Sequence, residues 1–171
     1  GADIEQIPYQ QLRITGIDYS EDMLHKAKQK FPISSITFLQ MDAQQLKFAD
    51  NTFDYVIGSL ILSVVPDGEK ALKEMVRVTK ADGTILLFDK FSPEGKRLTL
   101  MKRVMRNIIK FLGTDIGRSF EELYKASKGE ALLVEDEEVM FNGMYRKIVL
   151  KKRAEPLLVN MKIKQPSCKT N

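Results

Sequence analysis

Short apolar runs alternate with stretches of helical periodicity along the first half of the chain, a pattern typical of a parallel sheet covered by helices on both faces. The last of these runs is almost continuously apolar, as expected for a strand deep inside such a sheet. The predicted strands are Leu12–Ile17, Ile36–Leu39, Phe53–Ile57 and Thr84–Phe88.

Two helices are predicted between these strands. The first begins after Ser20, a suitable N-cap, and ends at Pro32, which cannot continue a helix. The second begins at Asp67 or Gly68, and an Asp82-Gly83 turn follows it. The apolar side of the second helix carries Ala71, Leu72, Met75, Val76 and Val78.

The pattern changes in the second half of the chain. A long helix is predicted from about Lys96 to Leu112, and a shorter one from Ser119 to Ser127. Two further runs, Ala131–Val139 and Tyr145–Lys152, are predicted strands separated by a turn at Gly143. Because the connection is short, we expect these two strands to pair antiparallel as a hairpin.

Composition narrows the possible chemistry. The chain has 171 residues, of which 43% are hydrophobic and 29% charged, as in ordinary globular domains. Cys168 and His25 are the only residues of their types, so a disulfide framework is excluded and a zinc site or a Ser-His-Asp triad is disfavoured. We therefore expect no bound metal, and a reducing cytoplasm is the expected compartment. The net charge of +4 is weak evidence for a polyanionic partner, and no nucleic acid partner is expected.

Two aspartates each follow a predicted strand, Asp18 after the first and Asp42 after the second. A carboxylate in the position of Asp18 can accept hydrogen bonds from both hydroxyls of a ribose. Asp18 could equally help to cap the helix that begins near Ser20. Asp42 could accept from an adenine amino group, or it could be an ordinary loop residue at the end of a strand.

The segment Phe53–Asp67 combines a strand, a loop at its carboxyl end and a proline turn into a helix, and Lys73–Phe88 continues through that helix to the next strand. Here the sequence resembles the class I S-adenosylmethionine-dependent methyltransferases, in the branch of the ubiquinone/menaquinone C-methyltransferases and the bacterial phosphatidylethanolamine N-methyltransferases. The segment Leu62–Asp67, together with Glu69–Met75 after it, is most similar to the lipid N-methylating members of this branch.

The resemblance runs from Gly1 to Lys152. It implies an α/β, Rossmann-like, doubly wound and mostly parallel sheet with a C-terminal antiparallel hairpin. Residues 1–152 would form the methyltransferase domain, and we expect residues 153–171 to be a partly disordered extension.

Carried over by position, the resemblance implies a site for S-adenosylmethionine. Asp18 would hold the ribose hydroxyls, and Asp42 would accept from the adenine amino group. Many relatives carry a histidine where Ser63 stands, so a general base at that position is not expected and the catalytic residue is unassigned. The other implied contacts are Tyr19 and Met23 against the adenosine, the Ala43 N–H, and Ser59 and Leu60 at the methionine end and facing the acceptor.

The resemblance also implies a first strand and a Gly-x-Gly-x-Gly loop ahead of Asp18, and both are missing from this sequence. Gly1 would be the end of that loop and a cofactor contact, and Ile4–Tyr9 would be the rest of the helix after it. The missing strand belongs in the middle of the sheet. We therefore expect a slot between two other strands and an N-terminally incomplete domain.

The long predicted helix carries a basic stripe of Lys102, Arg106 and Lys110 beside its apolar positions. Such a helix could lie on an anionic membrane surface, or it could cover the sheet with its basic side in solvent. The acidic run Glu135–Glu138 resembles a metal site, but side chains alternate along a strand, so a solvated edge is predicted.

The expected activity is methyl transfer from S-adenosylmethionine to a small molecule or a lipid headgroup, with peripheral membrane contact as a possible accompaniment. Proximity and orientation would do most of the catalysis, which agrees with the lack of a conspicuous acid–base pair. Two other classes stay open. One is a non-catalytic domain that keeps the fold without the cofactor, and the other is a Rossmann oxidoreductase that binds NAD.

Overall fold

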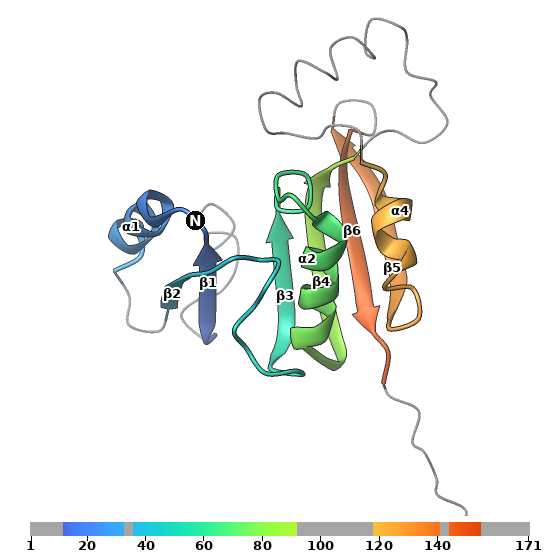
Figure 1. The fold of residues 1–171 in the computed structure, drawn as a ribbon, viewed down its shortest axis with the longest axis horizontal. Helices are drawn as coiled ribbons and strands as arrows, with labels where there is room; N and C mark the ends of the chain where they lie inside the picture. Colours follow the sequence, from blue (N-terminus) through green and yellow to red (C-terminus); the bar gives the residue numbers. More distant parts are fainter. Residues whose placement is uncertain (1–11, 33–35, 92–117, 141–143, 155–171) are drawn as a thin grey trace, which may run out of the picture.

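The computed structural model describes residues 12–32, 36–91, 118–140 and 144–154 (Figure 1). Helices and strands follow one another in the predicted order in this part of the chain, which confirms the α/β fold class. In chain order the elements are β1 (Ile14–Asp18), α1 (Glu21–Lys30), β2 (Ile36–Gln40), β3 (Phe53–Ser59), α2 (Gly68–Val78), β4 (Thr79–Lys90), α4 (Phe120–Lys125), β5 (Ala131–Met140) and β6 (Tyr145–Lys152).

The strands form two sheets. β1 and β2 pair in parallel as a two-stranded sheet, and the other strands form a four-stranded sheet in the order β3-β4-β6-β5. β3 and β4 are parallel, whereas β6 runs antiparallel to both β4 and β5. The predicted C-terminal hairpin is therefore confirmed, and it adds antiparallel strands to a parallel core.

The break between the two sheets lies between β1 and β3. These strands are neighbours and run in the same direction in Figure 1, but they belong to different sheets. Each therefore has one edge without a strand partner among the residues described. This arrangement agrees with the slot expected from the sequence. The chain continues from β1 to β2 on one side of the break and from β3 to β4 on the other (Figure 1).

Helix α2 begins because Asp67 caps it: Asp67 Oδ1 accepts a hydrogen bond of 2.9 Å from the Lys70 backbone N–H. Its apolar side packs on one face of the four-stranded sheet beside α4. Gly58 in β3 lies under this helix, and a Cβ there would lie 2.7 Å from the Met75 Cε, the flexible end of a side chain of α2. The fully buried centre of this core contains Leu62, Ala71, Leu72, Ile85, Leu87, Ile148 and Leu150.

Strand β4 is longer than the sequence predicted. It begins at Thr79, directly after α2, and the expected Asp82-Gly83 turn lies inside it as an irregularity. Asp82 has a φ of 59°, the left-handed conformation that such turns favour. The turn signal was therefore correct locally, but sheet pairing continues on both sides of it.

Arg146 joins the hairpin to α4. Its guanidinium donates to Glu121 at 2.8 Å and to both carboxylate oxygens of Asp136, and it lies over the Phe91 and Phe120 rings. The solvated edge predicted for the acidic run is confirmed, since residues 135–138 are all exposed on β5, the outermost strand of the four-stranded sheet as described. The predicted alternation is also observed, because Asp136 pairs with Arg146 whereas Glu135 pairs with Lys147.

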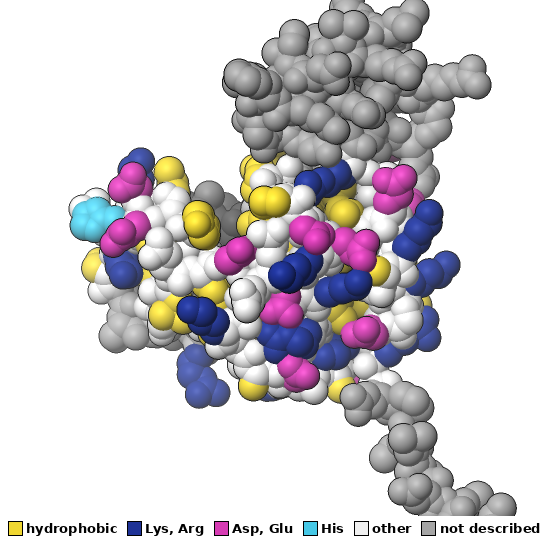
Figure 2. All heavy atoms as spheres, in the orientation of Figure 1, with side chains coloured by type: hydrophobic (Ala, Val, Ile, Leu, Met, Phe, Trp, Pro, Cys, Tyr) yellow, Lys and Arg dark blue, Asp and Glu magenta, His cyan; other side chains and the backbone are white. Residues whose placement is uncertain are grey.

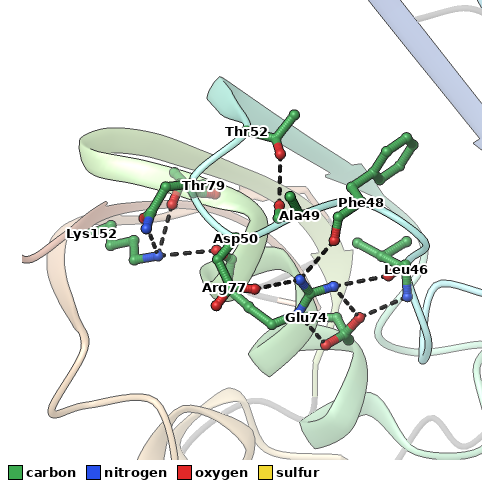
Figure 3. A network of polar contacts seen from close by, with 10 residues as sticks. Leu46, Phe48, Ala49, Asp50, Thr52, Glu74, Arg77, Thr79 and Lys152 are labelled. Carbon is green, nitrogen blue, oxygen red and sulfur yellow. Dashed lines mark hydrogen bonds and ion pairs between the residues drawn. The ribbon is translucent and has the colours of Figure 1, made fainter.

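A second arginine fixes the connection between β2 and β3 onto α2 (Figure 3). Arg77 donates to the backbone oxygens of Leu46 and Phe48 at 2.9 and 2.8 Å, and to the Asp50 carboxylate at 2.6 Å. Glu74 binds the same guanidinium and also accepts from the Leu46 N–H at 2.7 Å. Nearby, the Lys152 ammonium donates to backbone oxygens at the end of α2.

The long helix predicted for 96–112 lies outside the described residues. None of the helices that the structure does describe is long and apolar enough to cross a membrane.

The Arg77 network gives a prediction for acid stability. The hydrogen bonds from Arg77 hold the pKa of Glu74 below its ordinary value of 4.5. The Glu74 carboxylate therefore contributes stability at neutral pH that is lost as the pH falls through its lowered pKa. We expect Glu74→Gln to reduce the free energy of unfolding at pH 7 by about 1–3 kcal/mol. This deficit should shrink between pH 5 and pH 3.

Chemical denaturation at several pH values measures this difference. Glu69→Gln is the matched control, because Glu69 pairs with Lys73 on the exposed side of the same helix. It should cost less than about 1 kcal/mol. A deficit for Glu74→Gln that stays constant down to pH 3 would contradict the assignment.

Candidate functional site

The candidate site lies at the carboxyl ends of β1, β2 and β3, beside the break between the sheets. Parallel strands bring their carboxyl ends to one edge, and the chain turns to opposite sides of the break after β1 and after β3. Ligands of open α/β sheets bind at such a switch point. The structure therefore brings Asp18, Asp42 and Ser59 to the same edge.

Asp18 ends β1 with an exposed side chain. Its Oδ1 accepts a hydrogen bond of 2.8 Å from the Ser20 N–H, and the Ser20 hydroxyl accepts from Met23 N at 3.3 Å. The capping role considered for Asp18 is thus present. Within the described part of the chain, no hydrogen bond reaches its second oxygen, Oδ2. One carboxylate oxygen thus binds the backbone at the start of α1, and the side chain as a whole is exposed.

Asp42 is joined to α2 through Gln44. Asp42 Oδ1 accepts from the Gln44 backbone N–H at 2.8 Å and from its side-chain amide at 3.0 Å. The Gln44 amide oxygen in turn accepts from the Asp67 N–H at 2.8 Å. These bonds from Gln44, the backbone one first, hold the pKa of Asp42 below its ordinary value. Asp42 is therefore an anionic hydrogen-bond acceptor at neutral pH, fixed relative to the start of α2.

The loop after β3 begins with an unusual backbone conformation. Leu60 has a φ of 52°, which side chains other than glycine rarely adopt, and its N–H donates to the Phe88 oxygen at 2.9 Å. Leu60 and Val64 are exposed, whereas Leu62 and Ser63 between them are buried. In Figure 2 apolar side chains appear at the top of the four-stranded sheet, over the loop that follows β3, whereas charges of both signs cover α2.

The other predicted contacts differ in their surroundings. Tyr19 and Met23 are 77% and 50% exposed, so both present apolar surface beside Asp18. Ala43 is partly buried against the hydrophobic core, which limits it to the backbone role predicted for it. Gly1 lies outside the described residues. The predicted ligand contacts of all these residues stay predictions.

Three residues of this site were missed by sequence reasoning: Gln44, Asp89 and Arg118. Asp89 is completely buried and accepts from the Leu62 N–H at 2.7 Å. A signal for Asp89 existed, because the alternation of β4 places it on the same inward face as Ile85 and Leu87. The bond between Gln44 and Asp67 and the bonds of Arg118 to the loop join distant parts of the chain, so they had no local signal.

Across the residues that the structure describes, no group of three or more His, Cys, Asp or Glu side chains is placed to hold a metal ion. The polar groups at the candidate site are carboxylates, which accept hydrogen bonds, and backbone groups, and both suit an organic ligand with hydroxyl and amino groups.

Comparison with known proteins identifies the family. The sequence profile described as "Methyltransferase domain" matches residues 1–87, just over half of the chain. The chain belongs to this methyltransferase domain family. This confirms the family resemblance inferred from the sequence.

Two curated relatives act on different molecules according to their names. A phosphatidylethanolamine N-methyltransferase from Cereibacter sphaeroides is 33% identical over 106 residues, which are 58% of this chain and 51% of that protein. A demethylmenaquinone methyltransferase from Staphylococcus epidermidis is 38% identical over 109 residues, which are 63% of this chain and 44% of that protein. The chain spans about half the length of the curated relatives it matches.

The fold is shared with solved structures. A SAM-dependent methyltransferase from Methanosarcina mazei superposes with a TM-score of 0.63 at 18% identity, covering 82% of each chain. At this identity the likeness shows the fold alone, and it confirms the Rossmann-like architecture.

The Asp42–Gln44 contact gives a prediction for the site. Gln44→Met removes the side-chain amide but keeps the backbone N–H, so we expect the pKa of Asp42 to rise toward its ordinary value of 3.8 without reaching it. Carboxyl-carbon NMR titration of the Asp42 side chain measures this. Gln45→Met is the control, because Gln45 binds Asp42 through a bond from its backbone N–H to the Asp42 backbone oxygen, which the substitution keeps. An unchanged titration in Gln44→Met would show that the amide does not bind Asp42 in solution.

Proposed function

We propose that this chain is the cofactor-binding part of an S-adenosylmethionine-dependent methyltransferase that acts on a small molecule or a lipid headgroup. The observation that carries the proposal is the arrangement at the carboxyl ends of β1, β2 and β3. There, two carboxylates from consecutive strands lie beside a loop with a left-handed first residue. Membership of the methyltransferase domain family supports the same conclusion.

The residues present fit this cofactor. The exposed Asp18 carboxylate can accept from the ribose hydroxyls, and the anionic Asp42 can accept from the adenine amino group. Tyr19 and Met23 offer exposed apolar surface for the adenosine, with the Ala43 backbone beside them. Ser59 and Leu60 would line the methionine end.

Bound S-adenosylmethionine supplies a methyl group on a positively charged sulfur, which is already a strong electrophile. The protein's task is therefore to bind, to orient and to exclude water. Asp18 and Asp42 fix the nucleoside, and the Leu60–Asp67 loop presents its exposed Leu60 and Val64 side chains toward an apolar acceptor. Ser63 is buried, which gives no support to a base at that position.

For the acceptor, we propose the amine of a lipid headgroup. The relative from Cereibacter sphaeroides is named for such an acceptor. The choice also rests on the segment Leu62–Asp67, which is most similar to the lipid N-methylating members of the family. The Staphylococcus epidermidis relative supplies the second candidate, a quinone. Transfer of a labelled methyl group to phosphatidylethanolamine vesicles or to demethylmenaquinone distinguishes them.

Calorimetric titration of the full-length protein with S-adenosylmethionine tests the cofactor assignment. We expect binding with a stoichiometry near one, and we expect Asp18→Asn to weaken it by about tenfold or more. The reason is that a neutral amide loses the charge-assisted bonds to the ribose hydroxyls, worth about 1.5–3 kcal/mol. Asp22→Asn is the control, since Asp22 lies in the first turn of α1, outside the proposed site.

Other outcomes favour the other classes. No binding by the full-length protein would favour a non-catalytic domain. Binding of NADH, seen as enhanced fluorescence, together with no response to S-adenosylmethionine would favour an oxidoreductase.

We also propose contact with an anionic membrane surface through Lys102, Arg106 and Lys110, all outside the described residues. Each basic residue near such a surface contributes about 1 kcal/mol. Changing all three to Glu should therefore abolish flotation with vesicles that contain anionic lipid. Flotation of this variant at the wild-type level would refute the proposal, and neutral vesicles serve as the control.

A further inference from the structure

The loop from Leu60 to Asp67 is held by side chains from outside it. Leu62 is bound at both of its backbone groups: its N–H donates to Asp89 Oδ2 at 2.7 Å, and its oxygen accepts from Arg118 Nη1 at 2.9 Å. Arg118 comes from a point 56 residues further along the chain. The contacts thus join β4 and the start of the α4 region to the candidate site.

Arg118 binds more of this loop than Leu62. Its Nη1 also donates to the Val65 oxygen at 2.7 Å, and its Nη2 donates to the Pro66 oxygen at 2.6 Å. The loop's own backbone bonds all converge on one acceptor, the Ile61 oxygen, at 3.1 and 3.2 Å. A guanidinium carries several donors in one rigid plane, so it can hold three carbonyls at fixed relative positions, whereas a lysine ammonium cannot.

Gly68 gives independent support for this arrangement. It is the first residue of α2 and is buried, with no need for a left-handed φ. A Cβ at this position would lie 2.8 Å from the Leu62 oxygen and 3.0 Å from Arg118 Nη1. The absence of a side chain at position 68 therefore leaves the space in which the arginine meets the loop.

We propose that Arg118 is a positioning residue for methyl transfer. With Asp89 behind the loop, it fixes the backbone that carries Leu60 in its left-handed conformation and sets the exposed Leu60 and Val64 side chains at the acceptor side of the site. This inference rests on the proposed function. Arg118 does not touch the reacting atoms but acts through the loop, so it should affect turnover more than cofactor affinity.

The test compares Arg118→Lys with Arg77→Lys in the full-length protein. Arg77 is a matched control, because its guanidinium also binds loop carbonyls, but those carbonyls belong to the 46–50 connection. Hydrogen exchange is followed in both loops. Methyl transfer to phosphatidylethanolamine vesicles or demethylmenaquinone is measured well below the melting temperature of each variant.

For Arg118→Lys we expect faster exchange in 60–67 and a fall in kcat of about tenfold to a hundredfold, the size associated with small displacements of groups around a reacting centre. The KM for S-adenosylmethionine should stay within about twofold of wild type, as expected when an interaction counts only in the transition state. Arg77→Lys should speed exchange only in 46–50 and leave kcat unchanged. Gly68→Ala, which crowds the same contact, should reproduce the kcat loss.

Contrary outcomes separate the two levels of the proposal. A wild-type kcat in Arg118→Lys despite faster loop exchange would overturn the positioning role and leave the proposed function intact. An equal kcat loss in Arg77→Lys would show a general effect of lost stability and would also overturn it. Failure of the wild-type protein to bind S-adenosylmethionine or to transfer a methyl group would overturn the proposed function, and the positioning role with it.

Discussion

The packing of α2 on the apolar face of the four-stranded sheet is the constraint on which the rest of the structure depends. The fully buried core residues on either side of the contact exclude water from it. Each neighbouring segment is then tied to α2 by polar contacts. At the start of the helix, the Asp67 N–H donates to the Gln44 side-chain amide oxygen. In its final turn, Arg77 binds the 46–50 connection, and the Arg77 backbone oxygen accepts a hydrogen bond from Lys152.

This dependence explains how stability and site geometry share the same residues. Asp67 both caps α2 and anchors the amide that orients Asp42. A change that moved the helix by a fraction of a turn would therefore displace a proposed nucleoside contact as well as the core. The side chains of Tyr19 and Met23 do not have this double role, since they are largely exposed to solvent and contribute little to the core. They can serve a ligand without a cost to the fold.

Local features of the fold were predictable because they depend on neighbours in sequence. Ser20 and Asp67 cap the two helices that the pattern predicted, and β5 and β6 pair antiparallel as expected. The start of β4 was missed because sheet pairing overrode the turn chemistry at Asp82. Asp18 and Asp42 were found because residues at strand ends are recognisable from the strands themselves.

The rest of the site depends on contacts that no local pattern encodes. Gln44 meets Asp67 across 23 residues, and Arg118 reaches the loop across more than fifty. Whether a glutamine or an arginine finds a distant carbonyl is decided by the packing of the elements that carry them. Periodicity predicts which face of an element is buried, but it does not predict which polar groups meet across that face.

The acidic run on β5 has a consequence for how molecules of this protein meet one another. β5 is the outermost strand of the four-stranded sheet as described, and it carries exposed Leu132, Val134 and Val139. Such an edge would ordinarily attract a second strand. If two copies of β5 paired antiparallel about Asp136, the two Asp136 residues would lie directly opposite each other and Glu135 of each copy would face Glu137 of the other, and like charges placed directly opposite oppose pairing. The carboxylates of β5 that form ion pairs with β6 therefore also disfavour edge-to-edge aggregation.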